Sequence, residues 1–366
     1  MAKVQQRQYR SGTLEKGLEV LETIESASEP LRIHDVAAKT GLERAAVFRL
    51  LCTLEDRGYV ERLDDKRYRA RSRTRMPRIC YVAPLAGNSF RVEVTEGLKQ
   101  AATSRGFHLE LIDTSDVEIP RNQVDTVIRS GAEVVILFQR RGSLAHVVAD
   151  RLLQEQIPVI SVETPVAGAI YFGGNSYRAG LLAGEALGNY AQKHWRGEFD
   201  RLVLLESSLS AAENMARLTG TVESVNQIVG ETPADKILHV DGLASRDASR
   251  EACLRVLQSL PKKCRVLVSC FNDPSAIGAL DAVQEAGRAE FTAIVGQNGT
   301  EESRAELAHR SSPLIASVAY FPERYGEQLM KIAASVVAHQ KTPLAIYTDH
   351  VLLNRSNLKK FYPSSR

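Results

Sequence analysis

Beyond residue 78, several apolar runs are each followed by a polar turn. The side chains of these turns can form the hydrogen bonds that would bind a small polar molecule. Asparagine amides and a glutamate carboxylate stand in these turns, where they can donate or accept hydrogen bonds. Ligands bind at the carboxyl ends of parallel strands, so we expect the turns to line a cleft. The alternative is that each polar group bonds at its strand end and contacts no ligand. The turns are Gly87-Asn88-Ser89-Phe90, Glu163-Thr164, Gly173-Gly174-Asn175, Asn272-Asp273 and Gln297-Asn298-Gly299.

The sequence carries no catalytic, metal-binding or nucleotide-binding signature. Gly173-Gly174 suggests a phosphate loop, but neither GxGxxG nor GxxxxGK[ST] occurs. The eight histidines include no HExxH motif, and the five cysteines are scattered, which favours reduced buried thiols over ligands or disulfides. We therefore expect no enzyme activity, no cofactor and no metal.

The segments that must position the turns alternate between strand-like apolar runs and helix-length amphipathic stretches. This alternation predicts an α/β fold with mostly parallel sheets covered by helices, and so many strands indicate two successive lobes. We expect strands at Ile79–Ala83, Leu109–Ile112, Val134–Phe138, Val159–Val162, Ala169–Phe172, Leu202–Leu205, Ile237–Val240, Val266–Cys270, Ala293–Val295 and Leu314–Val318. The expected helices include Val92–Arg105, Ser143–Glu155, Arg178–His194, Ala211–Val229, Ala248–Ser259, Pro274–Ala286 and Glu301–Ala308.

The N-terminal region has a different pattern, that of a winged helix-turn-helix. Ile33–Tyr59 reads as two helices around a turn at Gly41, and Leu14–Ser26 as a preceding helix. Alternating residues at 59–63 and 67–69, separated by a polar turn, predict a two-stranded wing.

Charge is unevenly distributed along the 366 residues, whose formal net charge is +3. Residues 1–78 hold 17 Lys and Arg against 12 Asp and Glu, whereas the remainder holds 30 against 32. A basic end on a neutral body suggests a polyanion-binding head. The N-terminus lacks a signal-peptide core and no run approaches a membrane span, so we expect a cytoplasmic protein.

Several motifs in the head make it similar to the DNA-binding domain of the isocitrate-lyase-regulator (IclR) family: LEKGLEVL at 14–21, VAAKTGL at 36–42, RLL at 49–51 and GYV at 58–60. The resemblance implies that the helix from residue 43 to about 55 enters the major groove. Ala45-Ala46 departs from the Ser or Thr common in the family, which places more weight on the arginines and the wing. The residues so implied in DNA binding are Arg44, Ala45, Ala46, Arg49, Lys66 and Arg67.

The region from Arg78 to about Leu358 resembles the periplasmic sugar-binding protein superfamily, especially its ribose-binding type and the core of the lactose-repressor family. The motifs that carry the resemblance are IPVISVE at 157–163, ARLTG at 216–220, FNDPSAIGAL at 271–280 and VGQNG at 295–299. The resemblance implies that ligand-binding residues are Asn88, Phe90, Glu163, Asn175, Arg217, Asn272, Asn298 and Tyr320.

These residue types suit a sugar, because guanidinium, amide and carboxylate groups bind pairs of hydroxyls and an aromatic ring covers the apolar face. Glu163 and Asn298 stand where the family usually has Asp, so an acidic or phosphorylated effector near Arg140-Arg141 is an alternative.

Together the halves predict a ligand-responsive transcriptional regulator, expected to be a homodimeric repressor of carbohydrate genes, with operator DNA and a sugar or sugar derivative as partners. A sugar-binding module without DNA output is the alternative. We expect the head at 1–70, a basic linker at 71–77 and a two-lobed domain at 78–366. Lobe 1 would comprise about 78–173 and 321–349, and lobe 2 about 174–320 and 350–366.

The basic stretch at 66–78 holds seven basic residues and no acidic one, and some of its arginines are expected to contact DNA. It has no Leu and contains Pro77, so we expect no hinge helix of the lactose-repressor type at Ser72–Met76.

Overall fold

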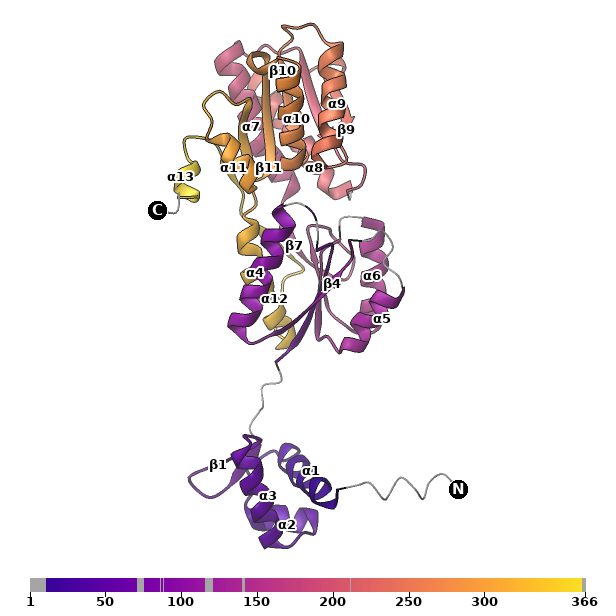
Figure 1. Cartoon of the computed structure of the whole chain (residues 1–366), viewed down its shortest axis with the longest axis vertical. Helices are drawn as coiled ribbons and strands as arrows, with labels where there is room; N and C mark the ends of the chain where they lie inside the picture. Colours follow the sequence, from indigo (N-terminus) through magenta and orange to yellow (C-terminus); the bar gives the residue numbers. More distant parts are fainter. Residues whose placement is uncertain are drawn as a thin grey trace. The chain divides into compact units, whose positions relative to one another are not determined.

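A computed structural model describes residues 11–70, 76–85, 87, 89–115, 121–139, 142–210 and 212–363. The chain forms two compact units, Met1–Met76 and Pro77–Arg366 (Figure 1). The expected domain bounds stay a prediction. Residues 71–75 lie outside the described residues. They make up most of the expected basic linker and most of the segment Ser72–Met76, where no hinge helix is expected.

The first unit is a winged helix-turn-helix, as predicted. Helices α1 (Gly12–Glu25), α2 (Ile33–Thr40) and α3 (Arg44–Asp56) precede an antiparallel wing of β1 (Val60–Arg62) and β2 (Tyr68–Ala70). Gly41 ends α2 with a φ of 68°, a conformation that favours glycine. A small core of buried side chains from all three helices and both strands holds the unit together: Val20, Leu21, Ile24, Val36, Val47, Leu51, Val60 and Tyr68.

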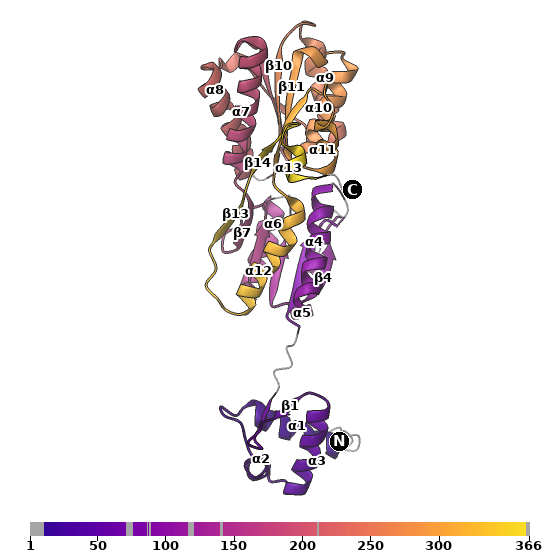
Figure 2. The same cartoon turned by 90° about the vertical axis from the view of Figure 1, so that its left-hand side faces the viewer.

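The second unit contains two six-stranded sheets, which confirms the α/β, two-lobed fold class (Figures 1 and 2). In lobe 1 the strand order is β13-β7-β6-β5-β3-β4 and every pair is parallel. Its strands are β3 (Arg78–Ala83), β4 (His108–Asp113), β5 (Val134–Leu137), β6 (Val159–Val162), β7 (Ile170–Gly174) and β13 (Ala345–Thr348). The helices of lobe 1 are α4 (Ser89–Arg105), α5 (Arg121–Ser130), α6 (Gly142–Gln154) and α12 (Tyr325–Val337).

In lobe 2 the strand order is β14-β12-β11-β10-β8-β9, and only β14 is antiparallel to its neighbour. Its strands are β8 (Arg201–Glu206), β9 (Ile237–Asp241), β10 (Val266–Cys270), β11 (Thr292–Asn298), β12 (Leu314–Ala319) and β14 (Val351–Leu353). Its helices are α7 (Ser176–Trp195), α8 (Ala216–Val229), α9 (Arg246–Ser259), α10 (Asp273–Glu285), α11 (Glu301–Leu307) and α13 (Leu358–Phe361).

The chain crosses between the lobes after β7, after β12 and between β13 and β14. The strand predictions did not include β13 and β14. These two strands are short and partly exposed, so their sequences lack the continuous apolar run of a buried strand.

Glycines allow helices α7 and α8 to pack backbone against backbone. A Cβ atom on Gly180 would lie 2.0 Å from the carbonyl oxygen of Arg217, and one on Gly184 would lie 2.3 Å from that of Thr221. The Thr221 hydroxyl donates to the Gly180 carbonyl at 3.3 Å, across the same contact. This contact supports the start of α8, where Arg217 lies.

We predict that Gly184→Val lowers the free energy of unfolding by about 1–3 kcal/mol, because the new side chain must push the two helices apart. Urea denaturation of the full chain measures the change. Glu185→Val places the same residue at the exposed neighbouring position of α7 and should cost far less. Equal losses in the two variants would show that the helix contact does not limit stability.

Candidate functional site

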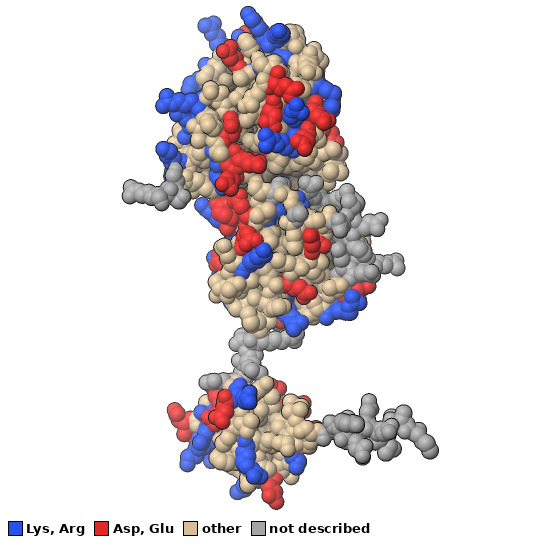
Figure 3. Space-filling model, in the orientation of Figure 1, with Lys and Arg blue, Asp and Glu red and all other residues tan. Residues whose placement is uncertain are grey.

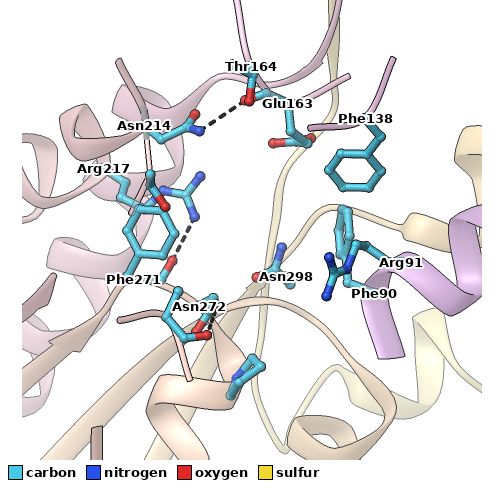
Figure 4. Close-up of a pocket in the computed structure, with 13 residues that line it drawn as sticks. Phe90, Arg91, Phe138, Glu163, Thr164, Asn214, Arg217, Phe271, Asn272 and Asn298 are labelled. Carbon is cyan, nitrogen blue, oxygen red and sulfur yellow. Dashed lines mark hydrogen bonds between the residues drawn. The ribbon is translucent and has the colours of Figure 1, made fainter. Parts of the chain in front are cut away.

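A pocket lies between the lobes at the carboxyl ends of their strands (Figure 4). Lobe 1 contributes residues at the start of α4 and after β5 and β6. Lobe 2 contributes residues before and within α8, after β9 and β10, at the start of α10 and at the end of β11. Polar and aromatic groups from opposite lobes therefore face one space. The lining residues are Phe90, Arg91, Phe138, Glu163, Thr164, Ser210, Asn214, Arg217, Ala244, Phe271, Asn272, Pro274 and Asn298.

Arg217 is one of two buried arginines that line this pocket, and contacts from several sides hold it in place. Its Nη1 donates to the carbonyl oxygen of Phe271 at 2.7 Å, and its Nη2 donates to Ser176 Oγ at 3.2 Å. The guanidinium carbon lies 4.4 Å from the Phe271 ring centroid and 5.6 Å from that of Tyr320. These contacts fix a planar donor group toward the cleft, as the close-up shows, and such a group suits adjacent ligand oxygens.

Glu163 supplies the carboxylate opposite. Its backbone adopts a φ of 60°, which turns the chain out of β6 and points the side chain into the cleft. Oε1 accepts from the Gly174 amide at 3.0 Å and from the Tyr325 hydroxyl at 2.5 Å. Burial raises the pKa of Glu163, while the Tyr325 hydrogen bond, the Arg217 charge and the Gly174 amide act in the opposite direction. Among the described residues nothing hydrogen-bonds to Oε2, so this oxygen is available to accept from a ligand.

Three asparagines add amide groups. Asn272 caps α10 through its side-chain oxygen, which accepts from the Ser275 amide at 2.9 Å, while its Nδ2 donates to the Ala244 carbonyl at 3.1 Å. Asn298 ends β11 with a φ of 116°. Asn214 Nδ2 donates to the Glu163 carbonyl at 3.0 Å and so joins the two lobes directly.

The carboxyl group of Asp273 is fully buried, next to Asn272 in the sequence, and it connects the turns that carry two of the asparagines. It accepts from the Thr300 amide and the Ser303 hydroxyl, both at 2.7 Å, and from the Ser317 hydroxyl at 2.6 Å. Burial raises the pKa of Asp273 to about 6 despite these hydrogen bonds. Because it ties α10, α11 and β12 together, Asp273 positions the turns that carry Asn272 and Asn298.

The structure brings five of the expected ligand residues into the pocket lining: Phe90, Glu163, Arg217, Asn272 and Asn298. Asn175 and Tyr320 instead lie beside it, Asn175 as the N-cap of α7 and Tyr320 with its hydroxyl donating to Gln297 Oε1 at 3.0 Å. Asn88 and the Arg140-Arg141 pair lie outside the described residues. A role in ligand binding stays a prediction for all of these residues, including the five that line the pocket.

Two lining residues, Arg91 and Asn214, were not among the residues predicted to bind a ligand. Asn214 lies three residues before Arg217, a spacing that places two residues on one face of a helical segment, and this signal could have found it. Arg91 follows Phe90 at the start of α4, where the apolar pattern drew attention to the aromatic ring alone.

In the head, α3 exposes Arg44, Ala45 and Arg49, whereas Ala46 is partly buried. Lys66 and Arg67 lie in the turn of the wing, with Lys66 at a φ of 65°. Arg67 pairs with Asp65, so a phosphate contact by Arg67 would compete with this ion pair. Figure 3 shows Lys and Arg side chains on the head interspersed with acidic ones.

No helix among the described residues is long and apolar enough to cross a membrane. No group of three or more His, Cys, Asp or Glu side chains there could hold a metal ion.

Two family models match the chain. One, for a periplasmic binding protein domain, matches residues 79–341, and the other, for an IclR helix-turn-helix domain, matches residues 13–64. The ribose import binding protein of Salmonella typhimurium is 26% identical over 267 residues, which cover 72% of this chain and 86% of that protein. Its Escherichia coli counterpart is 25% identical over 268 residues, with the same coverage.

Solved structures share the two-lobed fold. A solute binding protein from Mycobacterium smegmatis with bound glycerol has a TM-score of 0.70 at 20% identity, covering 79% of this chain and 98% of that one. A periplasmic solute binding protein from Actinobacillus succinogenes with bound D-allose has a TM-score of 0.66 at 16% identity, covering 78% and 99%.

We predict a pH-dependent contribution to stability from His350, which lies at the third crossing between the lobes. The pKa of His350 is lowered to about 4, and burial of the ring is the largest cause of this decrease. Its Nε2 accepts from the Asn175 amide at 2.9 Å, which requires the neutral ring. As the pH falls, the unfolded chain therefore takes up this proton first, at about pH 6.5. The contribution of neutral His350 to the free energy of unfolding is therefore fully present above about pH 6.5. It is lost as the pH falls from about 6.5 to about 4, and the total loss is up to about 3 kcal/mol.

Urea denaturation at several pH values should show this loss in the wild type relative to His350→Gln. The exposed-histidine variant His108→Gln should keep the wild-type profile. A His350→Gln profile parallel to the wild type would rule out the proposed contribution.

Proposed function

The chain belongs to the periplasmic binding protein domain family and carries an IclR helix-turn-helix domain, and from this premise we propose a ligand-responsive transcriptional regulator. The observation that carries the proposal is the presence of both domains in one chain. The first would read operator DNA, and the second would bind a small effector. We infer that the protein represses genes of carbohydrate uptake or catabolism and acts in the cytoplasm as a homodimer, since two heads match two half-sites.

A sugar or sugar derivative is the effector class that we propose. The named relatives are ribose import proteins, and the pocket lining combines a guanidinium, a carboxylate, amides and aromatic rings. These groups match the hydroxyl pairs and apolar face of a sugar ring. Neither matched family is described as an enzyme, and we propose binding without turnover.

Ligand binding would act by a shift in population between lobe arrangements. Residues from both lobes line the pocket, and Asn214 already contacts Glu163 across it. A ligand that contacts both lobes binds the closed arrangement better and therefore stabilises it. In a dimer, that change would alter the spacing of the two heads and hence the affinity for DNA.

One observation favours a second effector class, an acidic sugar derivative. The lining holds two guanidinium groups, of Arg91 and Arg217, against one carboxylate, that of Glu163. A ligand carboxylate would add an anion to this set and could accept bidentate bonds.

We predict that the full chain binds the DNA upstream of its own gene, with an affinity that falls steeply with salt. Arg49→Ala should weaken binding about fivefold to a hundredfold, because a bidentate arginine–guanine contact is worth about 1–3 kcal/mol. Fluorescence anisotropy with labelled duplex measures this change. Arg57→Ala removes the same charge from the C-cap of α3, more than two helical turns beyond Arg49, and should have less effect. Failure of the wild type to bind would favour a sugar-binding module without DNA output.

We predict that a sugar in the panel D-ribose, D-allose, myo-inositol, D-gluconate and D-galacturonate raises the melting temperature of the full chain. At a concentration of 100 times the Kd the stabilisation would be about 2.7 kcal/mol. Arg217→Gln and, independently, Asn214→Ala should reduce the shift measured against each variant's own ligand-free value. Arg255→Gln on the exposed side of α9 serves as the control.

A shift that survives both pocket substitutions would place the ligand elsewhere. Selective loss of binding to the two acids in Arg91→Gln would identify the acidic class, whereas equal effects on all sugars would assign the neutral class.

A further inference from the structure

The exposed face of α3 carries an aromatic side chain that the core of the head does not use. Phe48 is 46% exposed, although it lies next to the fully buried Val47. It is absent from the hydrophobic cluster of the head and from the residues packed against that cluster. Among the described residues it makes no ring contact with another aromatic side chain or a cation. The structure therefore offers no packing reason for a phenylalanine here.

The position of Phe48 on the helix is more informative than its exposure. At 100° per residue, Arg44, Phe48 and Cys52 form one row along α3, and Ala45 and Arg49 form the adjacent row. Phe48 thus lies between the two arginines expected to contact DNA, and the exposed Ala45 lies beside it. An apolar patch flanked by guanidinium groups occupies the face that would enter the groove.

The floor of the major groove offers few apolar groups, and the thymine C5-methyl group is the one that identifies a base there. The side chains of Phe48 and Ala45 cannot bind a phosphate, so the contribution of these side chains to DNA binding has to come from apolar contact. Alanine and phenylalanine are among the side chains that make such contacts with the methyl group.

We propose that Phe48, together with Ala45, contacts a thymine methyl group in each operator half-site. The inference rests on the proposed DNA-binding function and deepens it. Phe48 becomes a specificity-determining residue, and the half-site combines a thymine with the guanine or phosphate contacts of Arg44 and Arg49. On this proposal, the Phe48 ring is exposed in the free protein because its partner, the thymine methyl group, is part of the DNA.

Replacing thymine by deoxyuridine tests the contact, because it removes the methyl group and leaves base pairing intact. The probe is the shortest duplex from the upstream fragment that keeps wild-type affinity, with thymines replaced one at a time. We expect one position per half-site at which the full-length wild type loses affinity about fourfold, the value for burying one carbon group. Phe48→Ala should bind the thymine duplex more weakly and lose most of the discrimination between the two bases there, since only the contact of Ala45 remains. Phe48→Leu should keep more of the discrimination than Phe48→Ala.

Leu18→Ala is the matched control, since Leu18 is 48% exposed on α1 and not on the groove-facing helix. It should keep the wild-type ratio between the thymine and deoxyuridine duplexes. The proposal would be overturned if Phe48→Ala kept the full wild-type preference for the thymine duplex over the deoxyuridine duplex. It would also be overturned if the wild type showed no such preference at any position. Neither result would contradict the proposed DNA binding. Loss of the oligomer in Phe48→Ala, measured by sedimentation without DNA, would assign the ring to a contact between copies instead. Absence of DNA binding by the wild type would overturn the proposed function itself.

Discussion

The two lobes meet where the three crossing segments touch, and the geometry of the pocket depends on that contact. The amide of Asn175 donates to His350 Nε2, and the His350 ring lies 4.4 Å from the ring of Tyr320. A Cβ atom on Gly174 would lie 2.1 Å from the Tyr320 ring, so only glycine allows the first and second segments to come this close. These contacts tie the crossings to one another, and the strand ends of the two lobes face one another across the pocket.

Hydrogen bonds from the protein itself hold several polar groups of the pocket in place. Arg217 is bound to the Phe271 carbonyl and to Ser176, Glu163 accepts from Gly174 and Tyr325, and Asp273 bonds to three neighbours beneath the asparagines. Groups fixed in this way lose little conformational entropy on binding, which favours selectivity for hydroxyl geometry. The same burial that orients the carboxyl groups of Glu163 and Asp273 also raises their pKa values.

The head, by contrast, exposes side chains of α3 that are predicted to contact DNA. Its core is small, and α3 leaves Phe48 and the arginines Arg44 and Arg49 in solvent. Such a face would gain its contacts in a complex with DNA, where phosphates and base edges replace water. On the proposed function, the pocket and the head therefore differ in where their groups find partners: within the fold for the pocket, and in a complex with DNA for the head.

Local sequence patterns were sufficient for the fold class and for much of the pocket. The apolar runs predicted the buried strands, because a strand covered on both faces must be apolar throughout, and the turns after them named Glu163, Asn272 and Asn298. Tertiary structure alone decided which polar groups share the pocket and which support it. Asn175 and Tyr320 lie at the crossings, Asp273 lies beneath the asparagines, and Arg91 and Asn214 join the lining. A residue's type and spacing constrain its local element, but the direction of its side chain depends on how two lobes from distant parts of the chain come together.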